Sequence, residues 1–287
     1  QVLAQIDRAL VATGHRSVVL AQRGSSPAGE LVELPVPAGA LGEEARGLTH
    51  ARLRRLLAET VARVRPDLVH LHGVDFAAYL PPPGVPCVVT LHLPLDMHPA
   101  GSLRLSRPDT WLVPVSDSQA RSAPAELNLL RPIPNGVDVE AFGAGRLRRR
   151  RYVLCLGRIC EEKGFHLALE AAHMARAPLV LAGEVFPYPA HQAYFRERIE
   201  PLLDRRRRFV GPVVGAAKRE LLAAARCVIV PSLCAETSSL VAREALAAGT
   251  PVVALPNGAL PEAIDHGRTG FLVESVDAMA AAILRAD

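Results

Sequence analysis

The chain contains short, continuous apolar runs that recur along its whole length, and these runs limit its fold more than any other feature. Runs without alternating polar residues indicate parallel strands that are buried on both faces of a sheet. Helical or turn-rich segments separate most of the runs, so we expect an α/β protein. The predicted strands are residues 17–20, 30–36, 67–72, 86–92 and 110–116 in the first half and 152–157, 178–183, 208–211, 227–232, 250–255 and 270–274 in the second.

A chain of 287 residues is long for one domain and suits two. Residues 134–151 contain an Asn-Gly pair, two further glycines and several arginines, and we place the connection between the domains there. The prediction is an N-terminal domain at residues 1–140 and a C-terminal domain at residues 141–287. Apolar residues recur at helical spacing in residues 1–13, and Gly14 predicts the end of that helix. Aromatic residues form only 4% of the chain, so both cores must be built from Ala, Val, Leu and Ile.

The strands of the second half predict a doubly wound sheet, because crossovers between parallel strands are right-handed. Ligands of such sheets bind beyond the carboxyl ends of the strands. The residues that follow the strands are therefore the candidates for chemistry, namely Arg158, Gly183, Pro212, Ser232 and their neighbours.

The charge pattern gives little support for a nucleic-acid partner. The net charge is +4, and arginines are dense only at residues 146–151 and 205–208. Both runs stand just before apolar segments, and we interpret them as solvated loop ends. No stacking aromatics interleave with the arginines, so we predict no nucleic-acid binding. Weak peripheral attraction to an anionic membrane surface is the alternative.

The cysteines indicate a reducing compartment. They form no Cys-x-x-Cys pair, and most lie in or beside apolar runs, which favours reduced core thiols over disulfides or a zinc site. No apolar stretch approaches the roughly 20 residues that span a bilayer, and no signal-like segment opens the chain. We therefore expect a soluble cytoplasmic protein. The five thiols belong to Cys87, Cys155, Cys160, Cys227 and Cys234.

The segment GRICEEKGF places two cations at a strand-to-helix turn. Arg158 follows the predicted strand by one residue, and Lys163 lies five residues further on. Backbone N–H groups at such a turn, together with Arg and Lys, can hold a diphosphate by charge-assisted hydrogen bonds. The alternative is a pair of surface cations that neutralise Glu161 and Glu162.

The segment VIVPSLCAETSSLVAREALAAGTPVVA predicts a strand, a loop and a helix that begins near Ser238 or Ser239 and ends at Gly249. Such a helix start, with small side chains, can bind a phosphate. Glu236 precedes it and Glu244 lies inside the helix, and each carboxylate could accept hydrogen bonds from two sugar or ribose hydroxyls. Alternatively, Glu236 belongs to a capping arrangement and Glu244 is a surface residue paired with a cation.

Six sequence motifs, taken together in their order along the chain, resemble those of a known protein family. The motifs are PNGVDVEAF, GRICEEKG, LAGE, FVGPV, PSLCAETSSLVAREALAAGTPVVA and GALPEAIDHGRTGFLV. In this order they resemble the retaining GT-B glycosyltransferases of sequence family four. The resemblance implies two Rossmann-like, doubly wound domains facing a cleft. It also implies transfer of a sugar from a nucleotide diphosphate sugar, such as a UDP- or GDP-sugar, to an acceptor that the sequence does not identify.

The same resemblance assigns roles on the donor. It implies that Arg158 and Lys163 bind the diphosphate, that Glu236 contacts the donor sugar, and that Glu244 binds the ribose hydroxyls. The helix start at Ser239 and Leu240 is expected to bind the diphosphate as well.

Three further positions follow from the resemblance. His92, at the end of VVTLHLP, is implied to reach the sugar, and a histidine satisfied within the fold is the alternative. The backbone around Val213 and Val214 is implied to hold the base. Family members usually have Gly or Pro, Phe and Gly after the first glutamate, whereas this chain has Thr-Ser-Ser, which leaves the donor sugar open. The family's first strand with its glycine-rich loop, and its final crossing helix, are not seen in this sequence.

We expect no metal and no cofactor. Metal-using transferases commonly carry an Asp-x-Asp motif, which is absent from the sequence. Arg158, Lys163 and the helix start would instead stabilise the leaving diphosphate. The rival functions are a non-catalytic nucleotide-binding module, a nucleotide-sugar epimerase and, last, a nucleic-acid binder.

Overall fold

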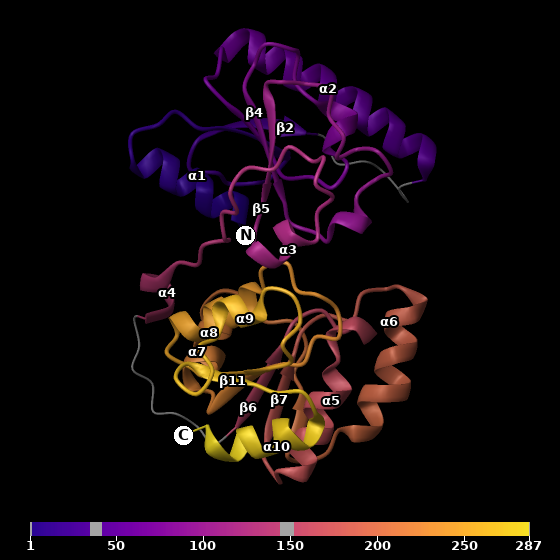
Figure 1. The fold of residues 1–287 in the computed structure, drawn as a ribbon, viewed down its shortest axis with the longest axis vertical. Coiled ribbons are helices and arrows are strands. Elements are labelled where there is room, and N and C mark those ends of the chain that lie inside the picture. The colour runs from indigo at the N-terminus through magenta and orange to yellow at the C-terminus, as the bar shows by residue number, and fades with distance from the viewer. Residues whose placement is uncertain (1, 35–41, 144–151, 287) are drawn as a thin grey trace. The chain divides into compact units, whose positions relative to one another are not determined.

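The computed structural model describes residues 2–34, 42–143 and 152–286, which divide into two compact units, Gln1–Gly136 and Val137–Asp287. The division falls inside the predicted connection. Each unit is α/β with parallel strands, as the continuous apolar runs predict (Figure 1). No helix within the described ranges is both long and apolar enough to cross a membrane.

Unit 1 has five described strands in two separately hydrogen-bonded sheets. Strands β1 (Val18–Gln22) and β2 (Glu30–Leu34) pair with each other, and β3 (Val69–Leu71), β4 (Cys87–Leu91) and β5 (Thr110–Pro114) form the other sheet in that order. Helix α1 (Val2–Ala12) ends before Gly14, whose φ of 86° confirms the predicted stop. The remaining helical elements are α2 (Glu43–Val64), α3 (Asp117–Arg121), and the short 3-10 helices η1 (Phe76–Tyr79) and η2 (Leu95–Met97).

Unit 2 contains one six-stranded parallel sheet in the order β11-β10-β9-β6-β7-β8. Numbered within the unit, this is the 3-2-1-4-5-6 order of a dinucleotide-binding doubly wound sheet, which confirms the prediction. The strands are β6 (Val153–Leu156), β7 (Leu179–Ala182), β8 (Arg207–Phe209), β9 (Cys227–Val230), β10 (Val252–Ala254) and β11 (Gly270–Leu272).

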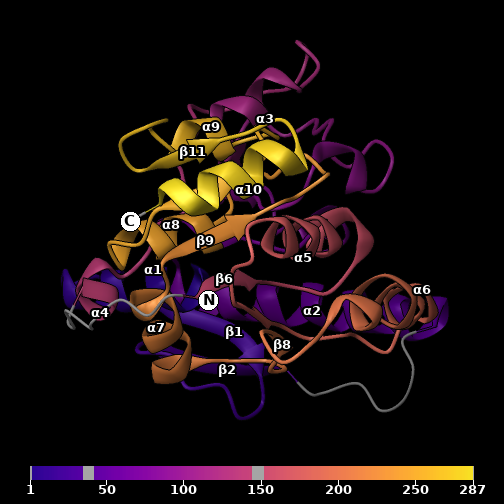
Figure 2. The same cartoon turned by 90° about the horizontal axis from the view of Figure 1, so that it is seen from below.

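Helices cover both faces of the unit 2 sheet (Figures 1 and 2). One apolar cluster joins the sheet to α5 (Phe165–Met174) and α10 (Val276–Arg285), and the other joins it to α7 (Gly215–Ala224) and α8 (Leu240–Ala247). The inner strands β6, β7, β9 and β10 are buried on both faces, which explains their unbroken apolar sequences, whereas the edge strand β8 carries an exposed Arg208. The other helical elements are α4 (Val139–Gly143), α6 (Pro189–Tyr194), α9 (Leu260–Ala263), the 3-10 helices η3 (Glu161–Lys163) and η5 (Glu200–Leu202), and the π-helical turn η4 (Phe195–Ile199).

Two expectations need correction. The predicted connection contains helix α4, whose Phe142 is buried in the unit 2 core. The arginine run at residues 205–208 is not wholly solvated, because Arg207 is buried and binds both Asp204 and His173, with its guanidinium 2.7 Å from each. The run at residues 146–151 and the last two residues of the predicted strand 30–36 lie outside the described residues. All five thiols are free and four of them are buried, as expected for core thiols.

Candidate functional site

The centre of the unit 2 sheet is the point where its strand order reverses. Strands β6 and β9 are hydrogen-bonded neighbours there, with Val153 opposite Cys227. The chain leaves β6 toward β7 on one side, whereas β9 leads to β10 on the other. Ligands of doubly wound sheets bind in the crevice outside the carboxyl ends of the strands at such a switch point. The loops after β6 and β9 are therefore the candidate site.

The two loops are joined by their backbones. The carbonyl oxygen of Glu162 accepts hydrogen bonds from the N–H groups of Leu233 at 2.9 Å and Cys234 at 3.3 Å. Gly164 has a φ of 65°, and a Cβ at this position would overlap the carbonyl oxygen of Pro231. Only glycine meets both demands without strain. The loop after β6 is thereby fixed against the loop after β9.

The structure brings Lys163 and Glu236 together across these loops. Lys163 Nζ lies 2.6 Å from Glu236 Oε1, and Ser232 Oγ donates a hydrogen bond to the same oxygen. The two charged side chains are 21% and 12% exposed. Within the described ranges, Lys163 thus pairs with Glu236 and with neither Glu161 nor Glu162, contrary to the surface alternative. Charge pairing at this depth is stronger than at an open surface, because the local dielectric constant is lower.

The backbone of Glu236 is held by the segment that follows β10. Glu236 forms a parallel bridge with Gly258, and the N–H of Ala259 donates to the Glu236 carbonyl oxygen at 2.8 Å. Asn257 Nδ2 also donates to the carbonyl oxygen of Ser232 at 2.7 Å. Three neighbouring loops therefore fix the position of one carboxylate.

Helix α8 begins beside this pair, at Leu240, with Ser239 as its N-cap residue, as predicted. Ser239 has a φ of 45°, and within the described residues its hydroxyl makes no capping hydrogen bond. The first N–H groups of a helix have no acceptor in the helix itself, which favours an anion at this end. The buried Ser238 Oγ also has no hydrogen-bond partner in the described part of the chain. This helix start offers donors of the kind that a phosphate needs.

Arg158 lies in the same loop as Lys163 but is more open to solvent. Its side chain is 53% exposed, and its guanidinium is 3.8 Å from Glu162. This part of the surface alternative agrees with the structure. An exposed pair at this distance contributes little to stability, so Arg158 can exchange Glu162 for a phosphate at low cost.

Glu244 is completely buried in α8 and is held by a cation from the neighbouring helix. Lys218 Nζ of α7 lies 2.6 Å from both carboxylate oxygens of Glu244. The alternative of a surface residue is therefore wrong. The predicted ribose contact would require ribose hydroxyls to share this carboxylate with Lys218, and it stays a prediction.

The two valines predicted near the base lie after the edge strand β8. Val214 is 80% exposed and is the N-cap residue of α7, whereas Val213 packs on the core. Lys218 follows in the first turn of that helix. The segment predicted to hold the base thus leads directly to the cation that holds Glu244.

In unit 1, His92 follows β4 and belongs to a group of three histidines. Its Nε2 lies 2.9 Å from Nδ1 of His72, and the two rings are stacked. The ring of His70 lies 4.1 Å from that of His72, centroid to centroid. Burial lowers the pKa of His92, and burial followed by the charges of His70 and His92 lowers the pKa of His72 to about 3. All three rings are therefore neutral near pH 7, and a neutral ring can both donate and accept a hydrogen bond.

Sequence reasoning missed four residues of these arrangements: Ser232 as a partner of Glu236, and Lys218, Gly258 and His72 altogether. His70 lies in β3 and His72 follows it directly, and β3 neighbours β4, so the approach of His72 to His92 could have been found from parallel pairing. The contacts of Lys218 with Glu244 and of Gly258 with Glu236 join residues that are far apart in sequence, and no local pattern marks them. Ser232 lies only four residues before Glu236, in the same loop.

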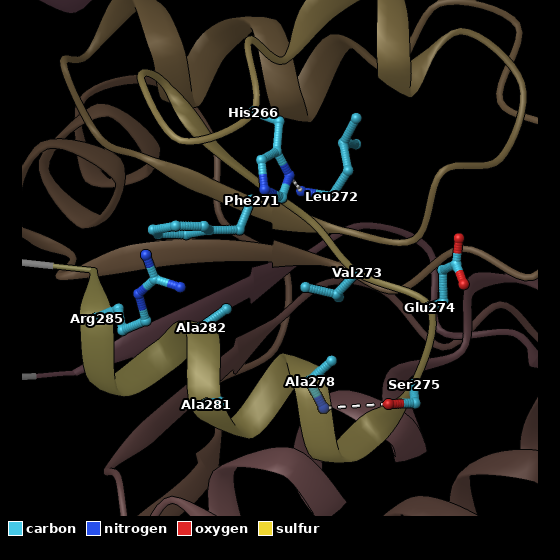
Figure 3. Close-up of a pocket in the computed structure, with 10 residues that line it drawn as sticks. All are labelled: His266, Phe271, Leu272, Val273, Glu274, Ser275, Ala278, Ala281, Ala282 and Arg285. Atoms are coloured by element: carbon cyan, nitrogen blue, oxygen red, sulfur yellow. Dashed lines mark hydrogen bonds between the residues drawn. The ribbon is translucent and has the colours of Figure 1, made fainter.

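A pocket of about 480 Å³ lies elsewhere in unit 2, between β11 and α10 (Figure 3). The guanidinium of Arg285 lies over the ring of Phe271, 5.1 Å from its centroid, and His266 Nδ1 accepts the N–H of Leu272. Among the described residues that line this pocket, none is a predicted site residue. The pocket is separate from the switch point.

The strand order of unit 2 defines a Rossmann-like, doubly wound class of protein. Comparison with known proteins makes this specific. Residues 150–286 match the family described as glycosyl transferases group 1, and residues 1–141 match glycosyltransferase family 4. The chain belongs to the group 1 glycosyltransferases of family four.

Individual relatives agree with this assignment. Glycogen synthase of Mycobacterium tuberculosis is 31% identical over 242 residues, which is 72% of this chain and 56% of that protein. The chain thus spans little more than half the length of this relative.

Two solved structures show the fold. Sucrose-phosphate synthase from Thermosynechococcus elongatus has a TM-score of 0.74 at 23% identity, over 98% of this chain and 82% of that one. Anabaena HepE in complex with UDP and glucose has a TM-score of 0.67 at 22% identity, over 99% of this chain and 84% of that one. The expected GT-B fold is confirmed.

Proposed function

We propose that the switch point of unit 2 binds a nucleotide diphosphate sugar, a UDP- or GDP-sugar, and that the whole protein transfers the sugar to an acceptor with retention of configuration and without a metal. The observation that carries this proposal is the Lys163–Glu236 pair beside the start of α8. It joins a diphosphate-binding cation and a sugar-binding carboxylate at one place. Family membership supports the retaining, metal-independent transfer, and the HepE complex supports a UDP donor.

The leaving group explains the cations. Cleavage of the bond between sugar and diphosphate leaves negative charge on the phosphate oxygens. Lys163, Arg158 and the N–H groups at the start of α8 are placed to stabilise that charge. Glu236 keeps the Lys163 charge neutralised while the donor is absent, so the donor phosphate replaces an existing partner rather than meeting a buried unpaired cation.

The rest of the donor follows the sheet edge. The ribose hydroxyls would bind Glu244 beside Lys218, and the backbone around Val213 and Val214 would hold the base. Glu236 and His92 would orient the sugar. In this scheme Glu236 serves two partners, Lys163 on the phosphate side and hydroxyls on the sugar side.

Two rival functions remain distinct from transfer. A non-catalytic nucleotide-binding module would show affinity for the donor without turnover. A nucleotide-sugar epimerase would return the sugar to its nucleotide, whereas a transferase releases the free diphosphate.

The first experiment is a thermal-shift screen of the full-length protein with UDP-, GDP- and ADP-sugars, because a ligand of the folded state raises the melting temperature. The screen is repeated in excess EDTA, and release of nucleoside diphosphate is then measured for the best donor. We expect binding and release to survive the chelator. Loss of turnover in EDTA with recovery on addition of magnesium or manganese would contradict the metal-independent mechanism.

The second experiment separates the two glutamates. Glu244→Gln should weaken both the free diphosphate and the intact donor by about 1 to 3 kcal/mol, since ribose is present in each. Glu236→Gln should leave diphosphate affinity nearly intact, because the proposed partners of Glu236 are sugar hydroxyls that the free diphosphate lacks, but it should lower transfer steeply. Glu274→Gln, at an exposed position of the same unit, is the matched control. Equal losses of diphosphate affinity in the first two variants would mean that Glu236 supports the loop rather than the sugar.

A further inference from the structure

Three different metal-ligating side chains meet beside the loop after β6. They belong to Cys160 and Glu162 in that loop and to His191 in α6, and their ligand atoms all lie within 4.8 Å of one another. All three residues lie inside unit 2. None of them has a role in the proposed binding of the donor, apart from the exposed contact of Glu162 with Arg158.

The surroundings of His191 indicate that a partner is missing from this group. Its Nδ1 is buried and has no hydrogen-bond partner in the described part of the chain. The ring is held edge-on by Tyr188 at 5.2 Å and by Phe186 at 6.4 Å, centroid to centroid. Native structures rarely leave a buried ring nitrogen unsatisfied, and a bound ion is one of the recognised explanations.

The other two ligands complement this nitrogen. The Cys160 side chain is fully buried, and its Sγ lies 3.6 Å from the carbonyl oxygen of Arg158. The Glu162 side chain is 44% exposed, so its carboxylate can move while the thiol and the ring stay fixed. Tetrahedral zinc, with bonds of about 2.0 to 2.3 Å, needs ligand atoms roughly 3.5 Å apart. Binding would therefore draw the three side chains closer together than the limit of 4.8 Å that they now meet.

We propose that Cys160, Glu162 and His191 form a binding site for a zinc-type divalent cation. One thiolate, one imidazole and one carboxylate leave the fourth tetrahedral position to water. A sulfur and a nitrogen ligand select zinc or a similar transition metal over magnesium or manganese, which prefer oxygen. The site is thus distinct from the oxygen-bound cations that accompany diphosphates. Binding forms the metal–sulfur bond and releases the thiol proton to solvent.

The consequence for the fold is a link between two elements. The metal would join the loop that carries Arg158 and Lys163 to helix α6, and it would take the Glu162 carboxylate from Arg158. The inference does not depend on the proposed function, because its test reads metal binding alone.

The test uses the full-length protein, stripped of metal with a chelator and desalted under reducing conditions. Titration with Co²⁺ should produce a thiolate-to-metal charge-transfer band, and equilibrium dialysis should show one Zn²⁺ bound per chain. Cys160→Ser should abolish the band, and His191→Gln should weaken zinc binding at least tenfold. Cys234→Ser and His15→Gln are the matched controls, a partly buried thiol of unit 2 and an exposed imidazole, and both should bind as the parent does.

The outcomes are decisive in both directions. Absence of the band in the parent protein, or its persistence in Cys160→Ser, would overturn the proposal. Unchanged zinc affinity in His191→Gln would also overturn it. Should Cys160→Ser fail to fold, as its circular dichroism would reveal, His191→Gln decides alone, because its side chain is only partly buried on a surface helix.

Discussion

A close backbone approach in the site predicts an unusual cost for one small substitution, Gly258→Ala. Gly258 has a φ of 65°, and a Cβ there would overlap the carbonyl oxygen of Glu236, lie 2.5 Å from its nitrogen, and lie 2.8 Å from the carbonyl carbon of Ala235. Contacts this short with main-chain atoms cannot be relieved by turning a side chain. The strand bridge between Gly258 and Glu236 must open instead.

The magnitude follows from two contributions. An alanine in the left-handed region costs about 1 to 2 kcal/mol, and overpacking in a tight site costs about 1 to 3 kcal/mol more. Gly267→Ala is the matched control, because Gly267 has a φ of 82° but open space around its Cβ position. We expect about 2 to 5 kcal/mol for Gly258→Ala and about 1 to 2 kcal/mol for the control.

Urea unfolding, followed by circular dichroism, measures the free energy of unfolding of both variants. The rate of sugar transfer reports whether Glu236 has been displaced. Gly258→Ala should lose transfer beyond its loss of stability, since the Glu236 carboxylate moves with its backbone. Equal destabilisation of the two variants, with equal activity, would refute the reasoning. It would show that the backbone around Glu236 can move away from an added Cβ at little cost in free energy.

Three further predictions concern unit 1, where the single tryptophan, Trp111, reports unfolding by fluorescence. Asp7→Asn should lower the free energy of unfolding of unit 1 by about 1.5 to 3 kcal/mol. The reason is that the buried Asp7 carboxylate accepts hydrogen bonds from one hydroxyl and from two backbone N–H groups. Wild-type stability in the variant would contradict this. His72 has a pKa of about 3 against an ordinary 6.5, so the unfolding free energy should fall as the pH drops from 6.5 toward 3, and His72→Gln should flatten that slope. Hydrogen bonds from Arg107, and then from a backbone N–H, lower the pKa of Asp109 to about 2. The stabilisation that Asp109 contributes should therefore be present above pH 3.8 and be lost as the pH falls from 3.8 to 2. An unchanged loss of stability over this pH range in Asp109→Asn would contradict this.

The sequence predicted the inner strands of unit 2 well because parallel strands buried on both faces are apolar at every position. Helix α4 escaped prediction for the opposite reason. Its five residues are too short for a periodic pattern, and only burial of Phe142 reveals that it packs on the core. Arg207 shows the same limit, since it is the buried one of four arginines and one of its partners, His173, lies on α5.

The candidate site was also predictable only in part. The position of the α8 start could be predicted from its small residues and from Gly249. The partners of the charged residues could not, because local sequence always offers a nearer one. Lys163 stands beside Glu161 and Glu162 but pairs with Glu236, 73 residues away. Glu244 stands beside Arg243 but binds Lys218 on another helix.

The pairing of β6 with β9 has a consequence for the order in which unit 2 folds. Val153 lies opposite Cys227, 74 residues further along the chain, whereas β6–β7 and β9–β10 join segments much closer in sequence. Closing the longest loop costs the most chain entropy, so we expect the two halves of the sheet to form before the seam between them. The Lys163–Glu236 pair forms only when that seam closes. A ligand that binds there should therefore slow unfolding while leaving the rate of folding nearly unchanged.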